Sequence, residues 1–346
     1  MFSAHPAHIR ALLRSCDVEI GGPAAVVRKL RRPTTTQLVL GFGAIYLIWG
    51  STYLGIRYAV ETIPPLLMMG IRHLSAGILV YSWARARGAE APRKKEWAFA
   101  AAAGALLFLG GHGVLAWAEQ KVASGLAALL CATLPLWTVL IARFDGTERK
   151  LSLKTIAGIL VGFAGVALLI GPDLLSQRLN WLAAGAVLSS SLLWAIGTAY
   201  TRKVSLPSSK VLSAGLQMMS GGALLLLMAV STGEAGRLRA ANVTALSVLA
   251  LVYLTIFGSI VAFTVYTWLV GVSSPSMVST YAYVNPVVAV FLGWMAAGEV
   301  LGIRTLIATA VILAGVALVS RRRKLEQETK SEPPAFDQEA WEAAGD

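Results

Sequence analysis

The sequence contains an internal repeat in which each copy holds an odd number of apolar segments. Trp49 and Trp194 lie in similar surroundings, and segments 70–77 and 215–222 are separated by the same 145 residues. Further along, Ala-Gly-Val-Ala-Leu occurs at both 164–168 and 314–318. Matches in the same order at a nearly constant offset indicate a duplicated structural unit. If each copy crosses a membrane five times, the second must enter from the opposite face, as inverted repeats do.

The composition places this duplicated region in lipid. Only 14% of the 346 residues are charged, 56% are hydrophobic and the mean hydropathy is +0.66, whereas soluble domains carry about 25% charged residues. Apolar stretches of about 20 residues, the length needed to cross a bilayer, recur along the chain. The predicted spans are 38–60, 64–84, 97–118, 123–143, 155–171, 180–201, 210–230, 243–269, 277–297 and 302–320. We therefore predict an all-α integral membrane protein with ten transmembrane helices in two inverted five-helix repeats.

The distribution of basic residues predicts the orientation. The net charge is +12. If the chain crosses the membrane ten times, 23 of the 30 Lys and Arg residues fall in the tails and loops on the same side as the N-terminus. Because cytoplasmic loops are enriched in Lys and Arg, both termini of this multi-pass protein of the cell (inner or plasma) membrane are predicted to be cytoplasmic. We expect a disordered basic tail over 1–36, repeats over 37–171 and 172–320, and a second disordered cytoplasmic tail over 321–346.

The sequence lacks the signatures of several other protein classes. It has no Gly-x-Ser-x-Gly nucleophile motif, no His-Glu-x-x-His zinc motif and no phosphate-binding loop ending in Lys-Ser or Lys-Thr. Cys16 and Cys131 lie on very different elements and are a poor disulfide candidate. We expect no enzyme activity, no cofactor, no metal and no nucleic-acid partner. The expected partners are the lipid bilayer and a small-molecule substrate, and the oligomeric state is left open.

Polar and aromatic residues inside the predicted spans are the candidate substrate-binding residues. Polar groups at membrane depth face the bundle interior or a water-filled cavity. On one face of the first span these residues are Trp49, Thr52 and Tyr53, and on one face of the sixth span they are Ser190, Trp194 and Thr198. The two tryptophans are repeat mates, so we expect them to face one another across a central cavity. The alternative is that both are ordinary packing anchors.

The ninth span combines polar residues with a proline that distorts the helix. Tyr281 and Asn285 lie one turn apart, and Pro286 frees a backbone carbonyl for a polar substrate at mid-membrane. Its repeat mate is Pro135, so both prolines are predicted hinges. Only the second half has polar residues at the positions of Tyr281 and Asn285. We therefore expect the polar head of a substrate to lie near the ninth span. Alternatively, Asn285 only caps the kink.

Further candidates lie on the second, third and eighth spans. Phe263 and Tyr266 share a stripe on the eighth span and join the candidate binding residues. His112, the repeat mate of Phe263, is either a proton-coupling group or a structural residue. Arg72 either binds a substrate carboxylate or ties helix ends together. Glu119 and Gln120, at the outer end of the third span, are expected to form part of an external vestibule, and Glu119 is the other candidate for proton coupling.

Three features of the sequence support a family assignment. They are Ile48-Trp49-Gly50-Ser51-Thr52-Tyr53, Tyr281-Ala282-Tyr283-Val284-Asn285-Pro286, and Gly298-Glu299 followed by Gly315-Val316-Ala317-Leu318. Residues 37–320 resemble the EamA-type branch of the drug/metabolite transporter superfamily. The resemblance implies ten helices in two inverted repeats around a central substrate cavity, with Glu148 and Glu299 as loop caps outside the site. Members typically export amino acids, other metabolites or drug-like compounds.

The predicted function is secondary transport by alternating access. We expect a transporter of amino acids or related small metabolites, working as an exporter across the cytoplasmic membrane. The alternative within the same class is a multidrug exporter of small amphipathic compounds.

Overall fold

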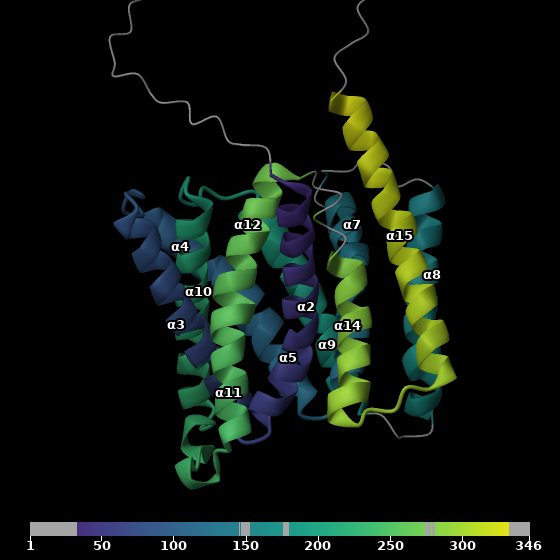
Figure 1. Cartoon of the computed structure of the whole chain (residues 1–346), viewed down its shortest axis with the longest axis horizontal. Coiled ribbons are helices and arrows are strands. Elements are labelled where there is room, and N and C mark those ends of the chain that lie inside the picture. Colours follow the sequence, from purple (N-terminus) through teal and green to yellow (C-terminus); the bar gives the residue numbers. More distant parts are fainter. Residues whose placement is uncertain are drawn as a thin grey trace, which may run out of the picture. The chain divides into compact units, whose positions relative to one another are not determined.

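The structure is a computed structural model that describes residues 33–144, 146, 153–175, 180–273, 278 and 281–331. Every regular element among these residues is helical (Figure 1). In the first half the helices are α2 (Thr35–Val60), α3 (Pro65–Ala86), α4 (Lys94–Gly104), η1 (Ala105–Gly113), α5 (Val114–Glu119), α6 (Ser124–Cys131), α7 (Leu134–Phe144) and α8 (Leu153–Leu175). In the second half they are α9 (Trp181–Thr201), α10 (Lys210–Ser231), η2 (Ala235–Arg237), η3 (Ala240–Asn242), α11 (Ala245–Tyr253), η4 (Leu254–Val261), α12 (Ala262–Val272), α14 (Tyr281–Ala297) and α15 (Ile303–Ser331).

Seven helical stretches of the described residues are long and apolar enough to cross a membrane. They coincide with seven of the predicted spans. The other three predicted spans, 155–171, 277–297 and 302–320, contain shorter apolar helical stretches at Leu153–Leu169, Val284–Ala297 and Ile303–Leu318. The prediction of an all-helical membrane protein is therefore confirmed, and the count of ten crossings stays a prediction.

Side-chain caps and glycines fix several helix ends. Asn180, Ser209 and Thr244 each precede a helix and accept a hydrogen bond from the backbone N–H three residues further on, at 3.0, 3.3 and 3.2 Å. Gly88 and Gly233 follow α3 and α10 with φ angles of 87° and 70°, a left-handed conformation that glycine adopts without a steric penalty. The chain thus reverses sharply after each of these two helices.

Helices α3 and α10 pack closely against each other (Figure 1). A Cβ at Gly77 would come within 3.0 Å of the backbone of Met219, and a Cβ at Gly222 within 3.0 Å of the backbone of Leu74. The two contacts are equivalent in the repeat, because Gly222 lies 145 positions after Gly77 and Met219 lies 145 positions after Leu74. Small residues permit this approach of membrane helices. Helices α8 and α15, a second pair of repeat mates, also lie side by side (Figure 1).

The remaining helices bring candidate site residues together inside the bundle. Helix α2 packs against α14, α11 and α12, and α9 packs against η1, α5, α6 and α7. Large apolar side chains such as Met68, Met69 and Leu129 are fully buried. Others point outward, including Leu40 and Leu249, which are about two-thirds exposed. Such exposure suits lipid, because a water-soluble surface rarely carries large apolar patches.

Two π-helical segments occupy corresponding positions in the two halves. Segment η1 lies between α4 and α5 and contains His112, while η4 lies between α11 and α12 and contains Gly258 and Ser259. A π-helical turn holds an extra residue and disturbs the regular hydrogen-bond ladder, and such turns are frequent at functional sites. The hydropathy pattern did not predict either segment.

The two predicted hinge prolines have different surroundings. Pro135 is the second residue of α7, and residues 132–133 before it form a non-helical break between α6 and α7. Pro286 lies inside the continuous helix α14. The chain is therefore non-helical just before Pro135 but helical around its repeat mate.

The C-terminal helix is longer than predicted. Helix α15 continues to Ser331, beyond residue 320, where the last predicted span ends, and the predicted disorder of the C-terminal tail stays a prediction. Arg, Lys, Glu and Gln dominate residues 321–331 and are good helix formers. Extending an existing helix also avoids the unfavourable nucleation step. The predicted tail over 1–36 lies mostly outside the described residues.

Candidate functional site

Four aromatic side chains form one cluster, here called the Trp49 cluster. The centroid of the Trp49 ring lies 5.3 Å from that of Tyr266 and 5.0 Å from that of Tyr281, and the two tyrosines are 6.1 Å apart. Phe263 lies 6.4 Å from Tyr266. The indole Nε1 of Trp49 donates a hydrogen bond of 3.2 Å to the Gly258 carbonyl in η4. The structure thus brings together four predicted binding residues from α2, α12 and α14.

A second group, the Trp194 cluster, joins α3, η1 and α9. His112 Nδ1 and His73 Nε2 form a hydrogen bond of 2.9 Å. The Trp194 ring lies 4.6 Å from that of His112, and Phe108 lies 4.5 Å from His73. His112 is therefore half of a histidine pair, a partnership that the sequence analysis missed. Trp49 and Trp194 belong to different clusters, and their predicted placement across a cavity stays a prediction.

Arg72 is buried and connects α3 to the π-helical segment η4. Its side chain is 3% exposed, and its Nε donates a hydrogen bond of 3.0 Å to Ser259 Oγ. Its Nη2 lies beside Gly258, where a Cβ would approach to 3.1 Å. The Arg72 side chain thus links interior positions of α3 and η4, and both of its predicted roles stay predictions.

The hydroxyl groups predicted to line the site are partly engaged within the protein. Ser190 Oγ donates a hydrogen bond of 2.8 Å to the Val187 carbonyl, and the Tyr53 side chain packs against the hydrophobic core. Thr52 Oγ1 donates to the Trp49 carbonyl at 2.6 Å, and Thr198 Oγ1 donates to the Trp194 carbonyl at 2.8 Å. These two threonines keep acceptor lone pairs for other contacts.

Three buried polar side chains have atoms without a hydrogen-bond partner in the described part of the chain. The atoms are His73 Nδ1, Asn285 Oδ1 and both carboxylate oxygens of Glu119. Glu119 is 3% exposed, so the vestibule prediction is wrong for this residue, whereas its neighbour Gln120 is exposed. Burial without a hydrogen bond is unfavourable, and each such group in a native protein requires an explanation. Sequence analysis had identified Asn285 and Glu119 but not His73.

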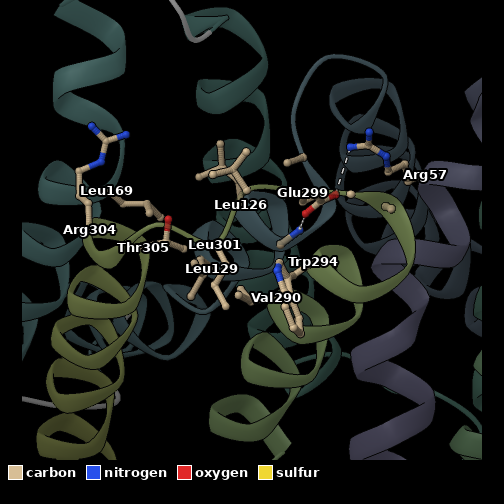
Figure 2. Close-up of a pocket in the computed structure, with 15 residues that line it drawn as sticks. Arg57, Leu126, Leu129, Leu169, Val290, Trp294, Glu299, Leu301, Arg304 and Thr305 are labelled. Atoms are coloured by element: carbon tan, nitrogen blue, oxygen red, sulfur yellow. Dashed lines mark hydrogen bonds and ion pairs between the residues drawn. The ribbon is translucent and has the colours of Figure 1, made fainter.

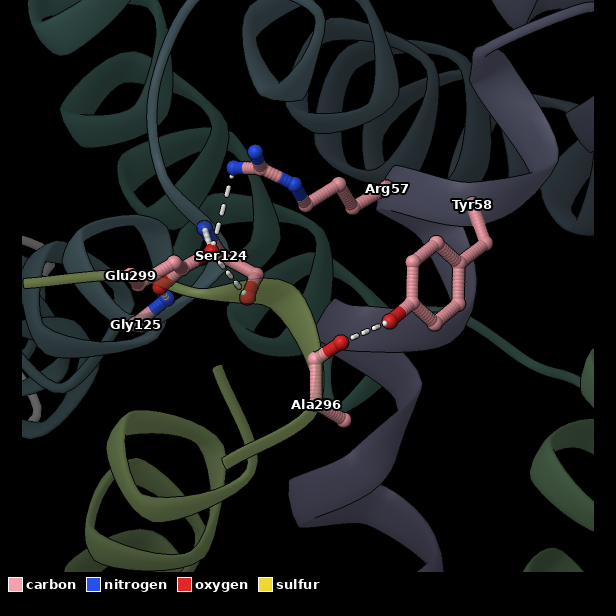
Figure 3. A network of polar contacts seen from close by, with 6 residues as sticks. All are labelled: Arg57, Tyr58, Ser124, Gly125, Ala296 and Glu299. Atoms are coloured by element: carbon pink, nitrogen blue, oxygen red, sulfur yellow. Dashed lines mark hydrogen bonds and ion pairs between the residues drawn. The ribbon is translucent and has the colours of Figure 1, made fainter. Parts of the chain in front are cut away.

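A polar network lies where α2 and α6 meet the segment that follows α14 (Figure 3). Glu299 accepts hydrogen bonds from Ser124 N, Ser124 Oγ and Gly125 N at 2.7, 2.7 and 2.9 Å, and forms an ion pair of 3.1 Å with Arg57. A carboxylate at a helix N-terminus also interacts favourably with the helix dipole. Glu299 is therefore a cap, as the family resemblance implied, and Glu148 lies outside the described residues.

A pocket of about 350 Å³ adjoins this network (Figure 2). Both charged and apolar side chains line it. Its lining includes Arg57, Leu126, Leu129, Val290, Trp294, Glu299, Arg304 and Thr305. None of the twelve predicted substrate-binding residues lines this pocket, so the predicted site and the pocket are different places.

The helices and their interior polar groups define a multi-pass membrane protein. The EamA-like transporter family matches residues 37–171 and 181–321. The chain belongs to this family of membrane transporters.

Similar proteins include named transporters from several organisms. The chain is 39% identical over 293 residues to the uncharacterized inner membrane transporter YedA of Escherichia coli strain K12, covering 82% of this chain and 92% of that protein. It is 25% identical over 282 residues to the uncharacterized transporter YoaV of Bacillus subtilis strain 168, covering 81% and 95%. A solved structure described as a crystal structure of a protein aligns with a TM-score of 0.58 at 22% identity, covering 84% of this chain and 99% of that chain. This last likeness concerns the fold.

Proposed function

We propose that the protein is a secondary transporter that exports amino acids or related small metabolites by alternating access around a central cavity. The observation that carries this proposal is that two aromatic clusters and buried, unpartnered polar atoms occur together inside the helix bundle. Ligand sites typically combine apolar and aromatic walls with a few placed polar groups. The Asn285 amide oxygen supplies such a group on α14. We propose export because the family that the chain resembles consists mostly of exporters.

The repeat architecture supports alternating access. Helix α9 is the repeat mate of α2, and α6 and α7 together are the repeat mate of α14. Helix α2 packs against α14, and α9 packs against α6 and α7, so the contact is the same in both halves. The family also matches the chain twice. We propose two inverted five-helix repeats with both termini in the cytoplasm. In such transporters one repeat rocks against the other around a site near the membrane midplane.

The helix irregularities supply places where this motion can occur. The break before Pro135, the proline inside α14 and the π-helical segments η1 and η4 all interrupt the regular backbone ladder. Sharp bends in helices arise at prolines and π-bulges. We propose that bending at these places exposes the two clusters alternately to each side.

The second candidate function is export of small amphipathic drug-like compounds. The Trp49 cluster favours it, because four aromatic rings offer a large surface with little directional specificity. A multidrug exporter would confer resistance to several unrelated toxic compounds and would leave amino-acid pools unchanged.

The proposal is tested by measuring metabolite pools inside and outside cells. Cells that overproduce the wild-type protein are compared by mass spectrometry with cells that overproduce Trp194→Ala or Tyr281→Ala at the same membrane level. We expect a selective rise of a few amino acids or related metabolites outside, matched by a fall inside, with the wild type only. Unchanged pools together with resistance to toxic compounds would favour the multidrug alternative, and an unchanged outcome in both assays would contradict export.

A further inference from the structure

The pocket beside the Glu299 network contains none of the residues proposed to bind the transported substrate (Figure 2). Its lining comes from the end of α2, the start of α6, the last part of α14, the segment after α14 and the start of α15, together with Leu169 of α8. The ion pair between Arg57 and Glu299 and the hydrogen bonds from Ser124 and Gly125 join three of these helix ends. The pocket therefore lies at one end of the helix bundle, where membrane helices leave the apolar core of the bilayer.

The charged and the apolar residues of the lining occupy different positions along the helices. Arg57 is three residues from the end of α2, Arg304 is the second residue of α15, and Glu299 lies between α14 and α15. By contrast, Val290 lies seven residues before the end of α14, which is about 10 Å along the helix axis. Leu129 is the sixth residue of α6. The pocket thus extends from charged groups near the helix ends to apolar groups deeper in the spans.

The pocket opens at Trp294 to the outer surface of the bundle. This tryptophan lines the pocket and is 51% exposed, and it lies about one turn before the end of α14. Phe291 and Met295 on the same helix are also about half exposed. Tryptophan is enriched at this depth of membrane proteins, because its ring is apolar and its N–H is polar. Lipid molecules can therefore reach the pocket sideways from the bilayer.

The charge of the lining favours an anion. Two arginines and one glutamate are the charged residues among the described side chains that line the pocket, which gives a formal net charge of +1. Arg57 and Glu299 offset each other in their ion pair of 3.1 Å, so the net charge belongs to Arg304. Arg304 and Thr305 also lie in the first turn of α15, where the positive end of the helix dipole favours negative charge.

We propose that this pocket binds an anionic phospholipid from the adjacent membrane leaflet. The phosphate lies beside Arg304 and the start of α15, because a guanidinium binds phosphate through parallel N–H donors. One acyl chain extends along Val290, Leu129 and Trp294. The cavity of about 350 Å³ is smaller than a whole phospholipid, so it takes the headgroup and the upper part of this chain. The rest of the lipid lies in the bilayer.

A lipid at this place would join two parts of the bundle. Helix α15 packs mainly against α8 and meets the rest of the bundle through α7 and α14. The pocket is lined by both α14 and α15, so its occupant would contact both helices and fill the space between them. This inference goes beyond the proposed function and does not depend on which substrate the protein transports.

The test is native mass spectrometry of the purified, delipidated full-length protein, titrated with phosphatidylglycerol. The comparison probes are phosphatidylcholine and diacylglycerol with the same acyl chains, and glycerol 3-phosphate, which has no chain. Phosphatidylcholine has no net charge, diacylglycerol lacks the phosphate, and glycerol 3-phosphate lacks the apolar part. We therefore expect phosphatidylglycerol to bind about tenfold or more tightly than each of them, as the loss of one charge-assisted hydrogen bond or of buried apolar area predicts.

Two variants test the location, each with a matched control. Arg304→Gln removes a charge from the lining, whereas Arg239→Gln removes one from an exposed loop position outside the lining. Ala297→Trp fills part of the pocket, whereas Ala296→Trp places the same side chain at an exposed neighbouring position outside the lining. We expect about tenfold weaker binding of phosphatidylglycerol in Arg304→Gln and Ala297→Trp, and wild-type binding in both controls. Gel filtration confirms that each variant is folded.

Three outcomes would overturn the proposal. Equal binding of phosphatidylglycerol, phosphatidylcholine and diacylglycerol would show apolar contact without recognition of the headgroup charge. Binding of glycerol 3-phosphate as tight as that of phosphatidylglycerol would show a site for soluble phosphate compounds instead of a lipid. An unchanged affinity for phosphatidylglycerol in folded Arg304→Gln or folded Ala297→Trp would place the lipid outside this pocket.

Discussion

Asn285 is the residue whose environment most directly predicts an effect on transport. It is buried in α14 with an amide oxygen that has no hydrogen-bond partner among the described residues. We predict that Asn285→Ala lowers the export rate about tenfold, the effect of losing one buried hydrogen bond of about 1.4 kcal/mol. The rate is measured as efflux of labelled substrate at equal protein level. Thr264→Ala removes an exposed hydroxyl on α12; it is the control and should export normally. A wild-type export rate in Asn285→Ala would show that Asn285 is not part of the site.

Glu299 and Arg57 share an ion pair but differ in their other contacts. Glu299 also accepts three hydrogen bonds from Ser124 and Gly125 at the start of α6, whereas Arg57 is partly exposed. We predict that Glu299→Ala lowers the free energy of unfolding by about 1–3 kcal/mol, because it strands buried donors. Arg57→Ala should cost less, within the about 0–1 kcal/mol typical of exposed pairs. Thermal unfolding in detergent measures both, and equal effects would contradict the capping role.

At the residue scale, sequence reasoning identified single groups but not their partners. His112 and Arg72 were found because polar groups inside apolar spans are conspicuous. The partner of His112 is His73, which lies 39 positions away on another helix, and no local spacing rule connects them. Glu119 was assigned to an exposed vestibule because it ends a predicted span, and only the packing of neighbouring helices shows that it is buried.

At the element scale, the close crossing of α3 and α10 makes a symmetric prediction. Gly77→Leu and Gly222→Leu should each destabilise the protein severely, because the new side chain would meet backbone rather than a movable side-chain end. Overpacking typically costs about 1–3 kcal/mol. Gly43→Leu on α2, where a Cβ meets nothing within 4 Å, is the matched control. Unfolding temperatures in detergent should fall by similar amounts in the first two variants, and a large drop in only one would contradict the reciprocal packing.

Helix existence could be predicted from hydropathy, but helix irregularity could not. The apolar spans coincide with helices because about 20 apolar residues are needed to cross a bilayer and only helices or closed barrels satisfy the backbone there. The π-helical segments η1 and η4 were missed because side-chain hydropathy does not report one extra residue per turn. The extension of α15 to Ser331 was missed because hydropathy ends the predicted span at residue 320, whereas polar residues can also propagate an existing helix.

At the scale of the whole molecule, the proposed inverted arrangement of the two repeats predicts that equivalent loops lie on opposite sides of the membrane. Gly88 and Gly233 are repeat mates in the turns after α3 and α10. Alkaline phosphatase fused after Gly233 should be active, whereas a fusion after Gly88 should be inactive and a green fluorescent protein fusion there should fluoresce. The excess of Lys and Arg on one side is the physical reason. Activity of both phosphatase fusions would contradict an inverted arrangement.

The family and the broad function could be predicted from the sequence because the duplication and the Tyr281–Pro286 segment occur within the sequence itself. The grouping of the site residues could not. Trp49 and Trp194 are equivalent in the repeat, yet each packs with a different set of rings. Those sets are drawn from several helices, so their composition depends on three-dimensional packing rather than on sequence spacing.

The most direct test of the central claim is transport by the purified protein alone. Liposomes containing the full-length protein are loaded with the twenty common amino acids, and their loss is followed by mass spectrometry against protein-free liposomes and liposomes containing Asn285→Ala. We predict that a small subset leaves the wild-type vesicles several times faster than either control. Equal rates for all twenty in all three preparations would contradict transport of amino acids by this protein.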